Sequence, residues 1–252
     1  IVPLLTSAPK RISFSDNDAY MLVITASAPY VAVYKQNLDK TGYTRLSSGL
    51  PNFSTLHAIA LSPDGQYMAT GTSNIAIYKR NGDTFNTALN QPTNYINAQH
   101  RGFAWSENGV YLFAAIYDSS ALVVYKRTGD SFAKLTDSGA ISGASYATDV
   151  AISPDGTHIA IAVSTTTRYA IFKWNGSTLV RLTGLPATTL SLESMAYSDD
   201  GVYLAIAGGD GSGTVSTVDI FRRTGDTYVK IPDKVQTIMT ANGVAFGPVA
   251  AS

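Results

Sequence analysis

Cysteine is missing from the 252-residue sequence. Its absence excludes disulfide bonds, thiolate metal sites and a cysteine nucleophile. Charged residues are also scarce: they make up 14% of the chain, and 18 basic side chains balance 18 acidic ones to a net charge of zero. Nucleic acids and anionic membranes attract basic surfaces, so we expect neither of them as a partner.

Long hydrophobic runs and helical patterns are missing as well. No apolar run approaches the roughly 20 residues of a membrane-spanning helix, so we expect no membrane insertion. No segment keeps an apolar stripe at the helical period, which predicts almost no helix. Hydrophobic residues nevertheless make up 45% of the chain, and its 15 tyrosines outnumber its 9 phenylalanines. Such a chain can bury a core and present an uncharged polar surface to glycans or to other proteins.

What the sequence has in abundance is one repeated segment. Its fullest copy is Val150–Asp155 followed by Gly156, a short apolar strand that ends in a tight turn. The copies recur every 44–49 residues, close to the roughly 40–50 residues of a β-propeller blade. The residues that end the first strand of successive copies are Ser15, Ser62, Ser106, Ser153, Ser198 and Gly247.

Four strands, a to d, can be placed within each copy. They are short runs of β-branched and aromatic residues bounded by glycine, aspartate and asparagine. We interpret residues 1–252 as a single all-β domain, a β-propeller of five four-stranded antiparallel blades. Six blades are the alternative, with the last blade incomplete or completed by another chain. In the second copy the strands are expected at Ala58–Leu61, Tyr67–Gly71, Ile75–Tyr78 and Phe85–Leu89.

The ends of the chain bear on how the ring closes. Residues 1–6 resemble a d strand and residues 243–248 resemble an a strand, so we expect both termini at the closure. Shared strands at the seam and an incomplete sixth blade both remain open. The repeats themselves span approximately residues 10–48, 56–90, 101–136, 148–184 and 193–233.

The connections between strands fall into two classes. The a–b and c–d turns keep their residues from copy to copy, whereas the d–a and b–c connections vary. In an antiparallel blade the two variable connections emerge on the same face, and function is often carried by variable loops on a rigid scaffold. We therefore expect a binding face made by Phe53, Tyr95, His100, Arg101, Tyr117, Asp118, Tyr146, Asp149, Arg168 and Glu193.

No catalytic or metal-binding grouping is evident, and we expect no cofactor and no metal. His57 and His100 are placed just before an a strand and His158 at the start of a b strand, with no spacing to carboxylates that suits metal ligation or base catalysis. The aspartate-rich turns recur in the same form, which favours turn-stabilising hydrogen bonds over calcium binding. A serine nucleophile elbow is also missing.

Two stretches, Val150–Ala162 and Val123–Leu135, resemble a WD40-like repeat of bacteriophage virion proteins and bacterial surface proteins. The Trp-Asp dipeptide of eukaryotic WD40 proteins is absent. The resemblance implies a non-enzymatic module of a virion or cell surface, such as a tail fibre, decoration or receptor-binding component. Its partners are expected to be other virion or surface proteins, or a host glycan or receptor, within a larger assembly.

Two alternatives to this function remain open. One is a propeller hydrolase, of lactonase or glycosidase type, which needs two carboxylates facing each other across a substrate. Asp149 and Glu193, both expected immediately before an a strand, are its candidates. The other alternative is an intracellular protein–protein scaffold.

Overall fold

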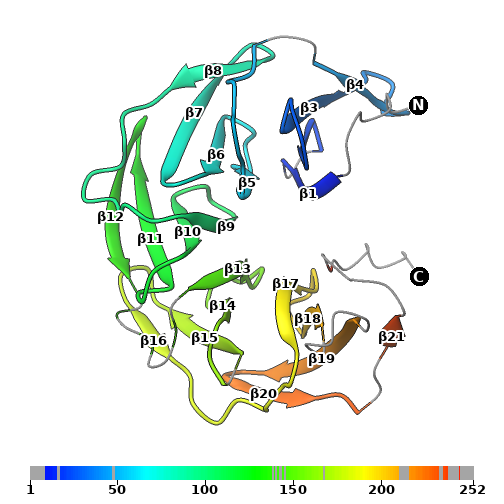
Figure 1. Ribbon diagram of the computed structural model, residues 1–252, viewed down its shortest axis with the longest axis vertical. Coiled ribbons are helices and arrows are strands. Elements are labelled where there is room, and N and C mark those ends of the chain that lie inside the picture. Colours follow the sequence, from blue (N-terminus) through cyan, green and yellow to red (C-terminus); the bar gives the residue numbers. More distant parts are fainter. Residues whose placement is uncertain are drawn as a thin grey trace. The chain divides into compact units, whose positions relative to one another are not determined.

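The computed structural model describes residues 9–15, 18–46, 49–137, 139, 141, 144, 146–166, 168–209, 216–232, 235–237 and 244. All 21 regular elements in these residues are β-strands, and they form five sheets in which four strands follow one another in chain order (Figure 1). These sheets are the blades of a β-propeller, so the predicted all-β fold and the five blades are confirmed. The described residues contain no helix that is long and apolar enough to cross a membrane.

Each blade is a series of antiparallel hairpins from strand a to strand d. Blade 1 contains β1 (Pro9–Phe14), β2 (Tyr20–Thr25), β3 (Val31–Gln36) and β4 (Tyr43–Arg45). Blade 2 contains β5 (Ala58–Leu61), β6 (Tyr67–Gly71), β7 (Ile75–Asn81) and β8 (Thr84–Ala88). Blade 3 contains β9 (His100–Trp105), β10 (Tyr111–Ile116), β11 (Leu122–Thr128) and β12 (Ser131–Asp137). Blade 4 contains β13 (Ala147–Ile152), β14 (His158–Val163), β15 (Tyr169–Trp174) and β16 (Leu179–Arg181). Blade 5 contains β17 (Ser191–Tyr197), β18 (Tyr203–Gly209), β19 (Ser216–Thr224) and β20 (Thr227–Lys230).

The chain divides into two compact units. Unit 1 comprises Ile1–Leu112 and Tyr125–Lys134, and it holds blades 1 and 2. Unit 2 comprises Phe113–Val124 and Leu135–Ser252, and it holds blades 4 and 5. Within unit 1, β5 contacts both β1 and β9, and within unit 2, β13 contacts β17. The a strands of successive blades therefore lie side by side inside each unit.

Blades bury their faces against one another, because a single sheet of this size cannot form a core alone. In unit 1, Leu22 and Val33 of blade 1 pack with Met68 and Phe85 of blade 2. In unit 2, Ile171 of blade 4 belongs to a core that also contains the blade 5 residues Leu204, Ile206 and Phe221. The second strands β2 and β14, which are covered on both faces, are buried at every position.

The a–b turns confirm the predicted turn-stabilising hydrogen bonds. In blade 4 the Ser153 hydroxyl donates to Asp155 Oδ1 (2.5 Å), which also accepts the backbone N–H of Thr157 (3.0 Å). Gly156 follows with φ of 69°, in the left-handed region that glycine adopts without strain. The same serine-to-side-chain bond occurs in blades 2, 3 and 5, where it involves Asp64, Asn108 and Asp200.

The first strands of three blades are interrupted by a β-bulge. The pairing of β13 with β14 shifts register between Ala147 and Asp149, and that of β17 with β18 shifts between Leu192 and Ser194. The extra residue of the bulge breaks the alternation of side chains along the strand, but the pairing with the neighbouring strand continues beyond it. As a result Asp149 and Glu193 lie inside β13 and β17, and their predicted position before the strand is wrong. His100 likewise opens β9 rather than preceding it.

One predicted loop contains a strand. β21 (Val235–Thr237) lies in the expected d–a connection after blade 5 and pairs antiparallel with Ser216–Val218 of β19. The nine-residue β19 pairs with β20 only through its last four residues, so its first half offers an edge to another strand. Residues 1–6, 243 and 245–248, which were expected to form strands at the closure, lie outside the described residues.

Candidate functional site

The b–c connections of three blades share one backbone form but carry different side chains. In blade 4 the Val163 N–H donates to Arg168 O (2.9 Å), the Arg168 N–H donates to Thr165 O (3.1 Å), and Arg168 has φ of 65°. Tyr30 in blade 1 and Ala121 in blade 3 hold the same place, with φ of 46° and 57°. Residues other than glycine are uncommon in this left-handed region and cluster at functional sites. The turn thus fixes the backbone position from which the side chain projects, whereas the type of side chain differs from blade to blade.

A second repeated position lies five residues before the serine or glycine that ends the a strand. In blades 1, 4 and 5 this residue is the extra residue of the bulge, which the cross-strand register skips: Lys10, Thr148 and Glu193 respectively. Blades 2 and 3 carry His57 and Arg101 there. Bulges re-aim side chains and are frequent beside active sites. The blades therefore offer a lysine, a histidine, an arginine, a threonine and a glutamate from one structural position.

In unit 1 two of these side chains, Arg101 and Lys10, act electrostatically on a third, His57. Partial burial lowers the pKa of His57 below its usual 6.5, and the positive charges of Arg101 and Lys10 lower this pKa further. Near pH 7 the imidazole is therefore mainly neutral and able to accept a proton. The Arg101 guanidinium also donates to Gln99 Oε1 (2.8 Å), which holds it near the start of β9. A neutral base within the electrostatic influence of two cations is suited to acyl-transfer chemistry.

His57 lines a pocket of about 340 Å³ in unit 1. Phe53 and Tyr78 form one wall and pack edge to face, with ring centroids 6.1 Å apart. Most of the other lining residues carry hydroxyl or amide groups, which can bind the hydroxyls of a polar ligand. The lining residues beyond these three are Asn52, Ser54, Thr55, Thr70, Thr72, Ser73, Ala76 and Gln99.

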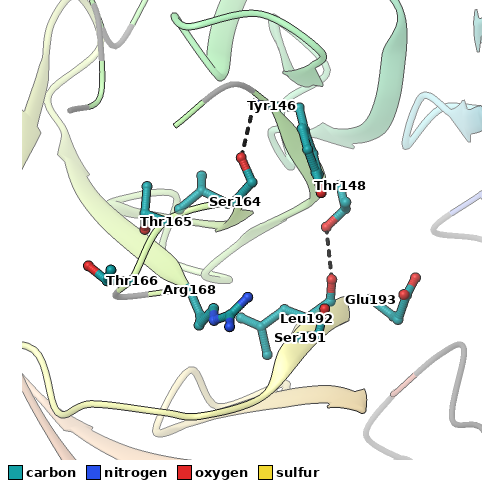
Figure 2. A pocket seen from close by; sticks show the side chains of 10 residues that line it. Tyr146, Thr148, Ser164, Thr165, Thr166, Arg168, Ser191, Leu192 and Glu193 are labelled. Atoms are coloured by element: carbon teal, nitrogen blue, oxygen red, sulfur yellow. Dashed lines mark hydrogen bonds between the residues drawn. The ribbon is translucent and has the colours of Figure 1, made fainter. Parts of the chain in front are cut away.

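Unit 2 contains a pocket of about 440 Å³ at the equivalent end of blades 4 and 5. Figure 2 shows the Arg168 guanidinium pointing toward the strand that carries Ser191 and Leu192, with Glu193 beyond that strand. Tyr146 lines the pocket and stacks flat on Tyr117, with ring centroids 4.7 Å apart and an interplanar angle of 0°. Tyr117 remains 45% exposed, so the pair forms an accessible aromatic surface. Hydroxyl groups at the pocket come from Thr148, Ser164, Thr165, Thr166 and Ser191.

Four of the predicted binding residues thus gather at this pocket: Tyr117, Tyr146, Arg168 and Glu193. Asp118 lies beside Tyr117, where its carboxylate accepts the Ser120 N–H (3.1 Å) within the b–c turn. Asp149 is buried, and its Oδ2 accepts the Met195 N–H (2.9 Å), which ties β13 to β17.

The remaining predicted residues lie in unit 1. Phe53 lines the His57 pocket, Arg101 contributes to the lowered pKa of His57, and Tyr95 is half-buried in the d–a connection. His100 is completely buried, with its Nδ1 2.8 Å from Ala98 O and its Nε2 3.1 Å from the Tyr125 hydroxyl. Burial lowers the pKa of His100 to about 4 and keeps the ring neutral.

Lys10 and His57 were missed as site residues in the sequence. The signal that identifies them is their offset within the repeat, because both lie five residues before the turn serine. No single stretch of sequence contains the set, since its members are about 45 residues apart. Among the described residues no group of three or more histidine, aspartate or glutamate side chains is arranged to hold a metal ion.

Comparison with known proteins places this geometry in a context. Residues 6–140 match the sequence model of a family described as "Lactonase, 7-bladed beta-propeller". A candidate 6-phosphogluconolactonase from Bacteroides uniformis is similar in structure, with a TM-score of 0.73 and 18% identity over 95% of this chain and 74% of that one. A second, from Bacteroides fragilis, has a TM-score of 0.65 and 17% identity over 90% and 70%. The Cps50 (Swd1) β-propeller domain of Myceliophteria thermophila has a TM-score of 0.67 and 12% identity over 90% and 74%. A comparison with curated proteins gave no match.

These findings confirm the WD40-like propeller and correct the expected function. The interpretation as a non-enzymatic virion or surface module is wrong, because the family match indicates a propeller hydrolase, which was the stated alternative. The physical reason for the error is that a blade repeat specifies the scaffold and not its chemistry. Side chains that act together come from separate repeats and form no local motif.

Proposed function

Because the chain belongs to the family of lactonases with a seven-bladed β-propeller, we propose that it is an enzyme that hydrolyses the ester bond of a lactone ring. The observation that carries this proposal is the neutral imidazole of His57, which lines a polar pocket and whose pKa the charges of Arg101 and Lys10 lower. All three residues lie within the matched segment, residues 6–140. We propose a sugar lactone as substrate, because the adjoining pocket is rich in hydroxyl groups and two structurally similar proteins are described as candidate 6-phosphogluconolactonases.

The chemistry needs one water molecule and no cofactor. His57 takes a proton from water, and the water oxygen forms a bond to the lactone carbonyl carbon. The carbonyl oxygen becomes an oxyanion, which the cationic side chains of Arg101 and Lys10 stabilise. The intermediate then collapses: the bond from the carbonyl carbon to the ring oxygen breaks, and that oxygen takes the proton from His57. The product is the open-chain hydroxy acid.

The first prediction concerns His57. The His57→Gln variant is expected to lose about 10²–10⁴-fold in kcat/KM, because a positioned general base contributes a factor of that size. Hydrolysis of glucono-δ-lactone and of its 6-phosphate is followed with a pH indicator, with the spontaneous rate subtracted. For the unaltered enzyme, kcat/KM is expected to fall below a midpoint lower than pH 6.5, since protonated His57 cannot act as a base.

Matched controls separate the role of His57 from the activity itself. Lys40→Gln removes an exposed lysine from the c–d turn of blade 1 and is expected to leave the rate unchanged, whereas Lys10→Gln makes the same change at the site and is expected to lower it. If His57→Gln keeps the full rate, the assignment of the base is wrong. If the unaltered chain does not exceed the spontaneous rate with either lactone, the proposed activity is wrong.

A further inference from the structure

The pocket of about 440 Å³ in unit 2 has no part in the proposed hydrolysis, which takes place at His57 in unit 1. Its volume lies within the range of about 300–1,000 Å³ that small-molecule sites occupy. All of its lining residues belong to unit 2, and none of them lines the His57 pocket. The pocket is therefore a separate binding site, and its side chains indicate which ligand it accepts.

Arg168 brings a positive charge to this pocket that the protein leaves unmatched. Its guanidinium makes no hydrogen bond or ion pair with the part of the chain that the structure describes. By contrast, the guanidinium groups of Arg80, Arg127 and Arg223 each bond to an oxygen atom of the protein. Because a guanidinium presents pairs of N–H donors in the geometry of a carboxylate, Arg168 is suited to bind an anionic group of a ligand.

The walls of the pocket are held in place by the protein itself. The b–c turn of blade 4 holds Arg168 at a φ of 65°. The Tyr146 N–H donates to Ser164 Oγ (3.3 Å), and the Thr148 hydroxyl donates to Leu192 O (3.1 Å), which ties β13 to β17 (Figure 2). A ligand that binds to walls already fixed in this way loses less free energy to the ordering of the protein.

The charges at the pocket favour a ligand with a single negative charge. Arg168 is the cationic residue of the lining, and Glu193 is the anionic one. The Glu193 carboxylate is exposed and makes no hydrogen bond or ion pair with the described residues, so its charge is not neutralised there. A phosphate monoester carries roughly 1.5 to 2 negative charges near pH 7, and Glu193 repels it more strongly than it repels a carboxylate. The anionic group that fits is therefore a carboxylate.

Hydroxyl groups flank the guanidinium on two sides. Figure 2 shows Arg168 between the turn that carries Thr166 and the strand that carries Ser191. Both of these residues are exposed, and neither hydroxyl is hydrogen-bonded to a described residue. A hydroxyl donates and accepts, and so it matches the hydroxyl groups of a sugar. An acid without hydroxyl groups would displace water from both side chains without replacing its hydrogen bonds.

An aromatic ring completes the lining. Tyr146 is half-buried in the wall, and Tyr117 lies flat against it with ring centroids 4.7 Å apart, which fixes the plane of the Tyr146 ring. Aromatic rings in a polar pocket provide flat apolar contact, while the few polar groups around them set the orientation of the ligand. A ligand that has a ring as well as hydroxyl groups and a carboxylate uses every part of this lining.

We propose that the pocket in unit 2 binds a hexuronate, a sugar ring that carries one carboxylate. The carboxylate pairs with the Arg168 guanidinium, the sugar hydroxyls bond to Thr166 and Ser191, and the ring lies against Tyr146. This inference does not rest on the proposed lactone hydrolysis, because the two pockets share no residue.

Isothermal titration calorimetry of the full chain with D-glucuronate tests the proposal. Three compounds serve as controls: D-glucose lacks the carboxylate, cyclohexanecarboxylate has the ring and the carboxylate but no hydroxyls, and glucose 6-phosphate carries the larger charge. Glucose and cyclohexanecarboxylate are each expected to bind at least about tenfold more weakly than glucuronate, because each loses a charge-assisted hydrogen bond or several neutral ones. Glucose 6-phosphate is also expected to bind more weakly than glucuronate.

Variants of two arginines in blade 4 assign the binding to the pocket. Arg168→Gln is expected to weaken glucuronate binding at least about tenfold. Arg181→Gln makes the same change at an exposed arginine of β16 outside the pocket and is expected to leave the affinity unaltered. Arg168→Gly removes the side chain and the backbone strain together and is expected to lose binding to the same extent. Its urea midpoint shows that the loss does not come from unfolding.

Several results would overturn the proposal. It is wrong if glucuronate binds no more tightly than glucose, cyclohexanecarboxylate or glucose 6-phosphate, or if Arg168→Gln binds glucuronate as well as the unaltered chain does. His57→Gln keeps the two sites apart: it is expected to bind glucuronate normally while it loses hydrolysis. If His57→Gln abolishes the binding, glucuronate occupies the pocket in unit 1 and this inference is wrong. Normal glucuronate binding by a chain that hydrolyses neither lactone would contradict the proposed function alone.

Discussion

At the scale of single residues, the b–c turns show how a fixed backbone presents variable chemistry. Arg168, Ala121 and Tyr30 all have a positive φ, between 46° and 65°. An L-residue pays a steric penalty in this region because its Cβ crowds the backbone. Arg168 therefore holds a strained conformation at the rim of the pocket in unit 2, and its side chain starts from a defined direction.

Replacing Arg168 by glycine separates this strain from the role of the side chain. Arg168→Gly is expected to leave the free energy of unfolding unchanged or to raise it by up to about 1 kcal/mol, because relief of the backbone strain opposes the greater freedom of glycine in the unfolded chain. Ala121→Gly is the matched control and is expected to behave alike. Urea unfolding gives both values. A loss of more than about 1 kcal/mol in Arg168→Gly alone would mean that the guanidinium itself stabilises the fold.

At the scale of strands and blades, the sequence predicts the scaffold well and the site poorly. The observed β5 and β6 have the predicted bounds Ala58–Leu61 and Tyr67–Gly71, because apolar runs bounded by Pro, Asp and Gly leave little choice of register. The bulges at Lys10, Thr148 and Glu193 were not predicted, since an extra residue in one strand is defined by its partner strand. The contacts of Lys35 with Asp83 and of Tyr67 with Asp130 likewise join residues 48 or more positions apart, and repeat spacing alone does not show which side chains meet.

The hydrogen bond from Tyr67 of blade 2 to Asp130 of blade 3 predicts a difference in stability effect between two equivalent tyrosines, Tyr67 and Tyr203. Tyr67→Phe removes the hydroxyl that donates to Asp130, and we expect it to lower the free energy of unfolding by about 1–2 kcal/mol. Tyr203→Phe makes the same change at the same position of blade 5 and is expected to stay within about 0.5 kcal/mol of the unaltered chain. Urea unfolding of the two variants side by side measures the contrast. Equal losses would show that the phenol stabilises each blade from within and that the hydrogen bond to Asp130 adds nothing.

At the scale of the whole molecule the net charge is zero, but several of the carboxylates form hydrogen bonds and ion pairs that favour their charged form. Hydrogen bonds from Lys79, Lys35 and Lys173 lower the pKa of their respective partners, Asp130, Asp83 and Asp226. At Asp155, burial raises the pKa, but hydrogen bonds from Arg223 and Ser153 outweigh it and leave the pKa well below the usual value. At Asp64, burial acts in the same direction and is outweighed by hydrogen bonds from Ser62 and Gln66. Two histidines also have a lowered pKa in the folded chain, because burial lowers the pKa of His158 and brings that of His100 to about 4.

These shifts predict that the folded chain is sensitive to acid. A group whose pKa is lower in the folded state contributes stability above its unfolded pKa, and that contribution is lost as the pH falls toward the folded value. The free energy of unfolding should therefore begin to fall below about pH 6.5, where the histidines of the unfolded chain take up protons. It should fall more steeply below about pH 4, where the aspartates of the unfolded chain take up protons. Urea midpoints at pH 7, 5.5, 4 and 3 follow the two stages. The double variant Asp130→Asn/Asp226→Asn is expected to be less stable at pH 7 but to lose less between pH 4 and 3, because neither site then takes up a proton. An unchanged slope in that interval would show that these two carboxylates do not carry the acid response.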